Sequence, residues 1–388
     1  MSQAQEIQLQ IRGTPEHESG HAENGGGSKA ADRRQLAGSS IRWWLMVMVD
    51  MFIVLCGQTI ATLLGRLYYN SGGSSIWMAT LTQSGGSPLI AILLLLTPPD
   101  SADAGPQPPA SKMLPIYLGL GILIGFDNLM YSYALLYLPV STFALVAATQ
   151  LGFNSITSRL INKQRFTALI ANSVVVLTFS ATLLGVGSSS DGTSSNLPPG
   201  KYTLGFILTL SASAVFALIL SLLEVTFEKV IGTRTFRWVL RVQLYTGLVA
   251  SAVTVCGLFV SGEWRTIPGE MAAYKDGRAR YVATLVGTAV SWQAMAVANL
   301  RLITRVSSLF ANVTGTVALP LVPVFAVVLF GDKMTGIKAV AMLMAVWGFL
   351  SYVYQHFLDG RRAAMGKDGA AECCVCSARA GGEAVLHA

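Results

Sequence analysis

Several polar side chains lie within long apolar stretches of this sequence, and they are the residues most able to do chemistry. Asp127 and Asn128 lie in one apolar stretch, and Gln150 and Asn154 lie in the next. Because a helix rises 1.5 Å per residue, Asp127 and Gln150 are each expected roughly 16–18 Å from a turn at Pro139. An ionisable group at that depth in a bilayer is a functional-site candidate.

Aromatic and amide side chains in other stretches are expected at a similar depth. Trp292 and Gln293 begin about 17 Å below the outer end of their stretch, and Thr316 lies equally deep from the inner side. Such a set suits a planar, nitrogen-rich heterocycle, because rings stack on aromatic faces and amides form paired hydrogen bonds with a ring edge. The predicted substrate-binding residues are Asn128, Tyr131, Gln150, Asn154, Trp292, Gln293 and Thr316, with Trp77 and Gln83 lining an outer opening.

Asp127 has a further candidate role in proton coupling. Burial disfavours the charged form of a carboxyl group, so Asp127 could take up a proton outside and release it inside. Two structural alternatives stay open. Asp127 could instead bond to nearby amides or helix ends and lock the two helices together, and Gln150 and Asn154 could simply join helices.

The composition places these residues in a polytopic membrane protein. Of 388 residues, 52% are hydrophobic and 12% are charged, and the mean hydropathy is +0.54. Although the net charge is +7, the Lys and Arg lie in loops and tails, which argues for the lipid bilayer as partner and against nucleic acid. The chain lacks a phosphate-binding G-x-x-x-x-G-K-[ST] loop and metal-ligand pairs, so no cofactor, metal or catalysis is expected. The cysteines of the C-terminal tail suit palmitoylation or metal binding, although incidental thiols are preferred: Cys373, Cys374 and Cys376.

Hydropathy predicts an all-α protein with ten transmembrane helices. The expected ranges are 43–64, 76–96, 114–137, 140–160, 166–186, 202–227, 238–261, 281–303, 306–330 and 336–357. These divide into a disordered cytoplasmic tail (1–40), a five-helix repeat (41–186), a flexible linker (187–201), a second five-helix repeat (202–358) and a cytoplasmic tail (359–388). Weak similarity between the halves, such as Val140-Ser141-Thr142 and Val306-Ser307-Ser308, predicts an inverted repeat of the kind found in secondary transporters.

The positive charges predict how the chain crosses the membrane. With the N-terminus in the cytoplasm, sixteen Lys and Arg fall in inner segments and eight in outer ones, so both termini are expected inside. Arg301 and Arg305 are expected to extend to the inner surface. Glu224 and Glu228 are expected in solvent at the cytoplasmic boundary, and Asp50 is a possible site residue without further support.

The stretch DNLMYSYALLYLPVSTFALVAATQLGFNSITSRLINKQRFT (127–167) closely resembles the plant purine permeases, a branch of the drug/metabolite transporter superfamily. The resemblance continues in 57–77, 262–293, 306–339 and 348–359, and so covers nearly the whole chain apart from the tails. The family pattern D-N-x-x-Y-S-Y falls on Asp127, Asn128, Tyr131, Ser132 and Tyr133, an S-x-Q-like element falls on Thr149-Gln150, and W-Q falls on Trp292-Gln293. One departure is the stretch from Asn299 to Arg305, where two arginines replace what is usually a small, apolar stretch.

The resemblance implies the drug/metabolite transporter fold and alternating access, with proton-coupled uptake of adenine, cytokinins or related heterocycles such as alkaloids and vitamin-like bases. It also implies an integral membrane protein, in the plasma membrane or in an internal membrane. One alternative is another exchanger of this superfamily, such as a nucleotide-sugar carrier, which should need basic residues at midplane depth. Another is a membrane ligand sensor that binds a heterocycle without transporting it. The sequence carries no signal for oligomeric state.

Overall fold

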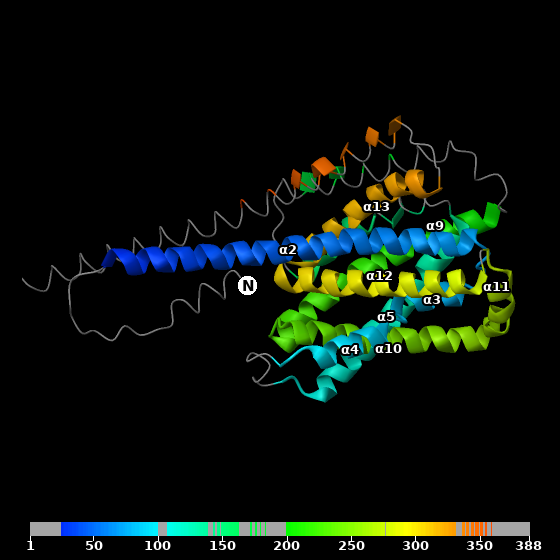
Figure 1. Ribbon diagram of the computed structural model, residues 1–388, viewed down its shortest axis with the longest axis horizontal. Coiled ribbons are helices and arrows are strands. Elements are labelled where there is room, and N and C mark those ends of the chain that lie inside the picture. The colour runs from blue at the N-terminus through cyan, green and yellow to red at the C-terminus, as the bar shows by residue number, and fades with distance from the viewer. Residues whose placement is uncertain are drawn as a thin grey trace, which may run out of the picture.

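The protein is described by a computed structural model as a bundle of helices (Figure 1). The structure describes residues 25–99, 107–138, 149–162, 199–275 and 277–330, together with single residues between 143 and 183 and between 336 and 358. The α-helices are α2 (Gly25–Asn70), α3 (Ile76–Ser84), α4 (Ser87–Leu96), α5 (Ala110–Tyr137), α7 (Gln150–Leu160), α9 (Pro199–Val225), α10 (Phe236–Ser261), α11 (Ile267–Ala273), α12 (Gly277–Arg305) and α13 (Ser308–Phe330). A π-helix, η2 (Thr226–Ile231), continues α9, and a 3-10 helix, η3 (Glu263–Arg265), follows α10.

The helical membrane class predicted from hydropathy is confirmed. Among the described residues, six helical segments are long and apolar enough to cross a bilayer: Ile41–Asn70, Ile76–Leu96, Ala110–Tyr137, Thr203–Ile231, Phe236–Ser261 and Gly277–Arg305. Most of the fifth predicted helix, nearly half of the tenth, and the turn at Pro139 lie outside the described residues. The long helix α2 begins at Gly25, inside the segment expected to be a disordered tail, and its first turns extend beyond the other labelled helices (Figure 1).

The second predicted span is broken in the middle, which hydropathy did not reveal. It consists of α3 and α4, separated at Gly85-Gly86. A Cβ at Gly86 would lie 2.4 Å from Cγ of Gln293, so only glycine allows this approach. The Nε2 of Gln293 donates hydrogen bonds to the carbonyls of Ser84 (3.2 Å) and Gln83 (3.4 Å), which are freed at the break. Broken helices are tolerated in membranes where neighbouring side chains satisfy the freed backbone groups in this way.

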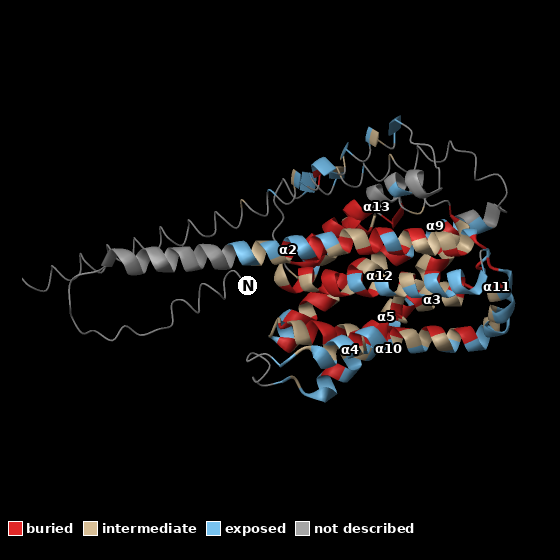
Figure 2. Ribbon diagram, viewed as in Figure 1, coloured by how far each residue is buried: buried red, intermediate tan, exposed pale blue. Residues whose placement is uncertain are grey.

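The exterior of the bundle is apolar, as contact with lipid requires. Large side chains such as Phe52, Leu95 and Val260 are 66%, 86% and 89% exposed, respectively, and exposed positions recur along the spans (Figure 2). Exposed apolar area of this extent marks a membrane or protein contact surface. The spans therefore present apolar side chains outward as well as inward.

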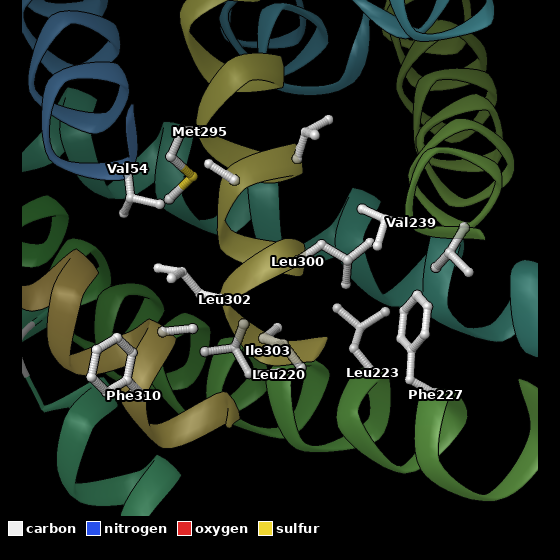
Figure 3. Close-up of a cluster of buried hydrophobic side chains, with 14 of the residues drawn as sticks. Val54, Leu220, Leu223, Phe227, Val239, Met295, Leu300, Leu302, Ile303 and Phe310 are labelled. Carbon is white, nitrogen blue, oxygen red and sulfur yellow. The ribbon is translucent and has the colours of Figure 1, made fainter. Parts of the chain in front are cut away.

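The hydrophobic core lies where α12 packs against α2, α9 and α13 (Figure 3). Ile303 and Leu300 of α12 point toward Leu220 and Leu223 of α9. Because lipid tails are as apolar as leucine, such contacts stabilise the bundle chiefly by van der Waals packing rather than by exclusion of water. Close fit between helices is therefore important for stability.

The contact between α5 and α10 depends on such a fit and gives a first prediction. A Cβ at Gly121 would lie 2.5 Å from Cβ of Val249 and 2.9 Å from the carbonyl oxygen of Thr246. A Cβ at Gly119 on the same helix would meet no atom of the described residues within 4 Å. We expect Gly121→Val to separate these helices and destabilise the protein by about 1–3 kcal/mol, and Gly119→Val to have little effect. Thermal stability of the two variants in detergent is the measurement. Equal stability of the two would show that close packing at Gly121 is not required.

Candidate functional site

A cavity of about 220 Å³ lies in the middle of the bundle, lined by residues of α2, α3, α5, α7, α9, α10, α12 and α13. Five of the predicted substrate-binding residues line it, as does the proton-coupling candidate: Gln83, Asn128, Tyr131, Gln150 and Trp292, with Asp127. These side chains come from four helices, α3, α5, α7 and α12, and Gln83 lies in the cavity wall although it was expected at an outer opening. The inner part of the wall is apolar and includes Leu220, Leu223 and Ile303 of the core in Figure 3.

Asp127 is the carboxyl group of this cavity. The residue is only 3% exposed, and Oδ1 has no hydrogen-bond partner within the described part of the chain. Unpartnered carboxyl oxygens are costly in a protein interior. Within the described residues, Oδ1 gives no support to the alternative in which Asp127 joins helices through bonds to neighbouring amides. The same oxygen could therefore bind a ligand or a proton.

Amides and a phenol build the polar wall beside Asp127. Gln83 Nε2 donates to Oγ of Ser132 (3.0 Å) and to the carbonyl of Asn128 (3.2 Å), so it ties α3 to α5. The hydroxyl of Tyr131 lies 3.4 Å from Oε1 of Gln150 and links α5 to α7. These contacts fix the side chains of the polar wall in place.

Aromatic rings flank the polar wall. The ring of Tyr131 packs edge-on against Phe143, with centroids 5.8 Å apart. Both rings and Trp292 line the cavity. A flat heteroaromatic molecule would therefore meet aromatic rings as well as amides, which is the combination predicted for it.

Four predicted site residues do not line the cavity: Trp77, Asn154, Gln293 and Thr316. Asn154 instead joins helices, because its Nδ2 donates to the carbonyl of Ser308 (3.2 Å) and its Oδ1 accepts from the hydroxyls of Ser158 and Ser221 (3.4 and 3.3 Å). This is the helix-joining role that the sequence left open for Asn154. Depth along a helix does not tell which face a residue occupies.

The other three residues also have structural partners. Gln293 satisfies the break between α3 and α4, as described above, and accepts a hydrogen bond from Gln243 (3.2 Å). The Thr316 hydroxyl donates to the carbonyl of Asn312 (2.8 Å) within its own helix. Trp77 lies against Gly257 of α10, where a Cβ would be 2.0 Å from the indole ring. Trp77 therefore packs α3 against α10.

Two acidic residues that were not predicted hold together the end of the bundle expected to face outside. Glu270, 7% exposed, accepts hydrogen bonds from the hydroxyls of Tyr68 (2.5 Å) and Tyr281 (3.2 Å) and from Ser75 N (3.1 Å). Glu263 accepts from the hydroxyl of Ser75 (2.6 Å). The available signal was two acids in a short segment between spans, in a chain where acids are scarce.

At the opposite end, the structure corrects the expectation for three charged residues. Asp50 is fully buried, and its carboxylate pairs with Arg305 (2.5 Å) and Arg301 (3.1 Å), so these arginines do not extend to the surface alone. Glu224 is also buried rather than in solvent, and it accepts hydrogen bonds from the backbone of Ser308 (3.1 Å) and from Asn162. Burial of these acids is offset by the arginine charges beside Asp50 and by the hydrogen-bond donors to Glu224.

Comparison with known proteins places these features in a wider context. Residues 45–362 match a family described as purine nucleobase transmembrane transport. The chain is similar to probable purine permease 11 of Arabidopsis thaliana, at 49% identity over 322 residues, 82% of this chain and 85% of the relative. It is also similar to probable purine permease 6 of the same plant, at 42% identity over 93% of this chain and 92% of the relative. A crystal structure of a protein sharing 15% identity superposes with a TM-score of 0.54 over 79% of this chain and 98% of that one, which is a likeness of fold.

Proposed function

Because this chain belongs to the purine permease family of purine nucleobase transporters, we propose that it imports adenine-type heterocycles together with protons. The protein is an integral membrane transporter of purine nucleobases and not an enzyme. The proposal extends this activity to adenine, cytokinins or related alkaloids and vitamin-like bases. It places the chain most simply in the plasma membrane, with both termini in the cytoplasm.

The central cavity is the observation that carries the proposed substrate. Its volume of about 220 Å³ is below the roughly 300–1,000 Å³ of sites for drug-sized ligands, which favours a compact molecule such as a single base. Its lining, within the described residues, contains Asp127 but no Lys or Arg. That charge pattern argues against a doubly anionic nucleotide sugar, which would need cationic partners.

The connections at the two ends support alternating access as the transport mechanism. Through Glu270, Tyr68 of α2 is linked to Tyr281 of α12, and at the other end Asp50 of α2 pairs with Arg305 of α12. These two helices also pack along their length, so we propose that they move as one rigid unit. In the proposed ten-helix fold of two inverted five-helix repeats, that unit would rock against the rest of the bundle around the substrate.

The decisive experiment is uptake of labelled adenine or zeatin by a host that lacks its own purine uptake. Uptake should be faster at an outside pH of about 5.5 than at about 7.5, because more protons are then available outside to bind Asp127 and enter with the base. Uptake should fall when a protonophore removes the proton gradient. Uptake indifferent to both conditions would contradict proton coupling. Binding without flux across proteoliposomes would identify a ligand sensor and contradict transport by this chain.

A further inference from the structure

Two amide carbonyls in the cavity wall have no partner among the described residues, and neither belongs to a predicted substrate-binding residue. Gln58 of α2 and Asn312 of α13 both line the cavity and are only 9% and 2% exposed. Their oxygens, Gln58 Oε1 and Asn312 Oδ1, lack a hydrogen-bond donor among the residues that the structure describes. A buried acceptor without a donor is costly, because it has lost its hydrogen bonds to water. Two of them in one ligand-sized cavity point to donors on the ligand.

The orientation of the Asn312 amide is fixed by its other end. Its Nδ2 donates a hydrogen bond of 3.1 Å to the backbone carbonyl of Gln150. A carbonyl can only accept, so the nitrogen must lie on that side and the oxygen on the other. Asn312 therefore presents an acceptor to the cavity rather than a donor.

Gln58 lies next to the same part of α13. A Cβ at Gly315 would be 3.1 Å from Gln58 Oε1, so the absent side chain at Gly315 leaves room for this carbonyl. Residues three apart on a helix lie on one face, and Gly315 follows Asn312 by three positions. The two free acceptors thus lie on neighbouring parts of the wall, where α2 meets α13.

We propose that Gln58 and Asn312 determine substrate specificity by accepting hydrogen bonds from N–H groups of the transported base. This inference rests on the proposed function, since it assigns residues to the cavity that holds the base. The polar groups of the site then have separate roles, because Asp127 exchanges the proton and the two neutral amides recognise N–H donors. Bases that present an amino or ring N–H group to this wall are preferred over analogues in which methyl groups replace those hydrogens.

The test measures inhibition of labelled adenine uptake by N6,N6-dimethyladenine relative to unlabelled adenine. Robust adenine uptake by the wild-type protein establishes transport first, so its failure counts against the proposed function alone. The wild-type protein should prefer adenine. Gln58→Met and Asn312→Leu keep approximate volume but remove the acceptor, and each should reduce that preference by about three- to tenfold, the effect of one net hydrogen bond.

Matched controls lie on the same helices. Thr59→Val and Thr314→Val remove hydroxyls that bond to carbonyls of their own helices and do not line the cavity, so they should retain the wild-type preference. If the hydrophobic variants do not reach the membrane, Gln58→Asn and Asn312→Gln, which displace the carbonyl by one methylene group, provide the comparison. A wild-type protein that is inhibited equally by the two compounds, or Gln58 and Asn312 variants that keep the wild-type preference for adenine, would overturn the inference.

Discussion

Replacing Asp127 with Asn is expected to abolish concentrative purine uptake while leaving exchange of substrate across the membrane intact. The two side chains have nearly the same shape, but the amide cannot bind and release a proton. A gradient of two pH units coupled to one proton supports accumulation of up to about 100-fold, because one unit corresponds to about 1.36 kcal/mol. The variant should therefore approach equal concentrations inside and outside.

The structure explains why exchange should survive. Oδ1 of Asp127 has no partner within the described residues, so the substitution breaks no hydrogen bond at this oxygen and leaves the cavity wall in place. Exchange of labelled for unlabelled adenine in proteoliposomes requires the substrate site and alternating access, but no net proton movement. The measurement is thus a comparison of gradient-driven uptake with exchange in the same preparation.

Glu228→Gln provides the matched control. Glu228 is a carboxylate outside the cavity, paired at 3.4 Å with Arg234, and its loss should leave both activities unchanged. Loss of exchange together with uptake in Asp127→Asn, accompanied by lower thermal stability, would instead assign Asp127 to joining helices. Undiminished gradient-driven uptake would remove Asp127 from proton coupling altogether.

The sequence predicted the helical membrane class, and it grouped several residues that the structure places around one cavity, because both follow from simple one-dimensional quantities. Apolar stretches of sufficient length identify spans, and the rise of a helix gives depth, which brought Asp127, Gln150 and Trp292 to one cavity. Depth alone could not separate Gln150 from Asn154. They share a helix, but Asn154 lies among Ser158, Ser221 and Ser308 and joins α7 to α9 and α13.

Other features depended on partners distant in sequence and could not be predicted from local patterns. The break at Gly85-Gly86 is stabilised by Gln293, more than 200 residues later. Gln58 became a candidate site residue only when the structure placed it in the cavity wall, with its Oε1 lacking a donor among the described residues. A polar residue in an apolar stretch needs a hydrogen-bond partner when it is buried. Only the tertiary structure shows whether that partner comes from the protein or from a ligand.

The arginines of α12 show the same principle and lead to a prediction about stability. In the sequence they departed from the family pattern as two added positive charges, but in the structure both pair with Asp50 of α2. The three residues differ in access to solvent: the Asp50 side chain is 0% exposed, whereas those of Arg301 and Arg305 are 25% and 18% exposed. Removing the arginines should therefore destabilise the protein by a different amount from removing the charge of Asp50.

We expect the double variant Arg301→Leu/Arg305→Leu to be destabilised by about 3–5 kcal/mol, because it leaves the buried Asp50 carboxylate without a counter-ion. Asp50→Asn should cost less, since the long arginine side chains can extend their charged ends toward water. Adding Asp50→Leu to the double variant removes all the charge from the cluster and should recover most of the lost stability. Thermal unfolding of the purified variants in detergent measures all three, with Arg234→Leu as a control that breaks a pair whose Glu228 partner is partly exposed.

The order of these stabilities distinguishes a structural cluster from a surface contact. Screened surface pairs contribute only about 0–1 kcal/mol, so a small loss in every variant would show that Asp50 is accessible to water. Recovery in the triple variant would instead show that burial of one unpaired carboxylate, rather than loss of packing by the arginines, causes the instability.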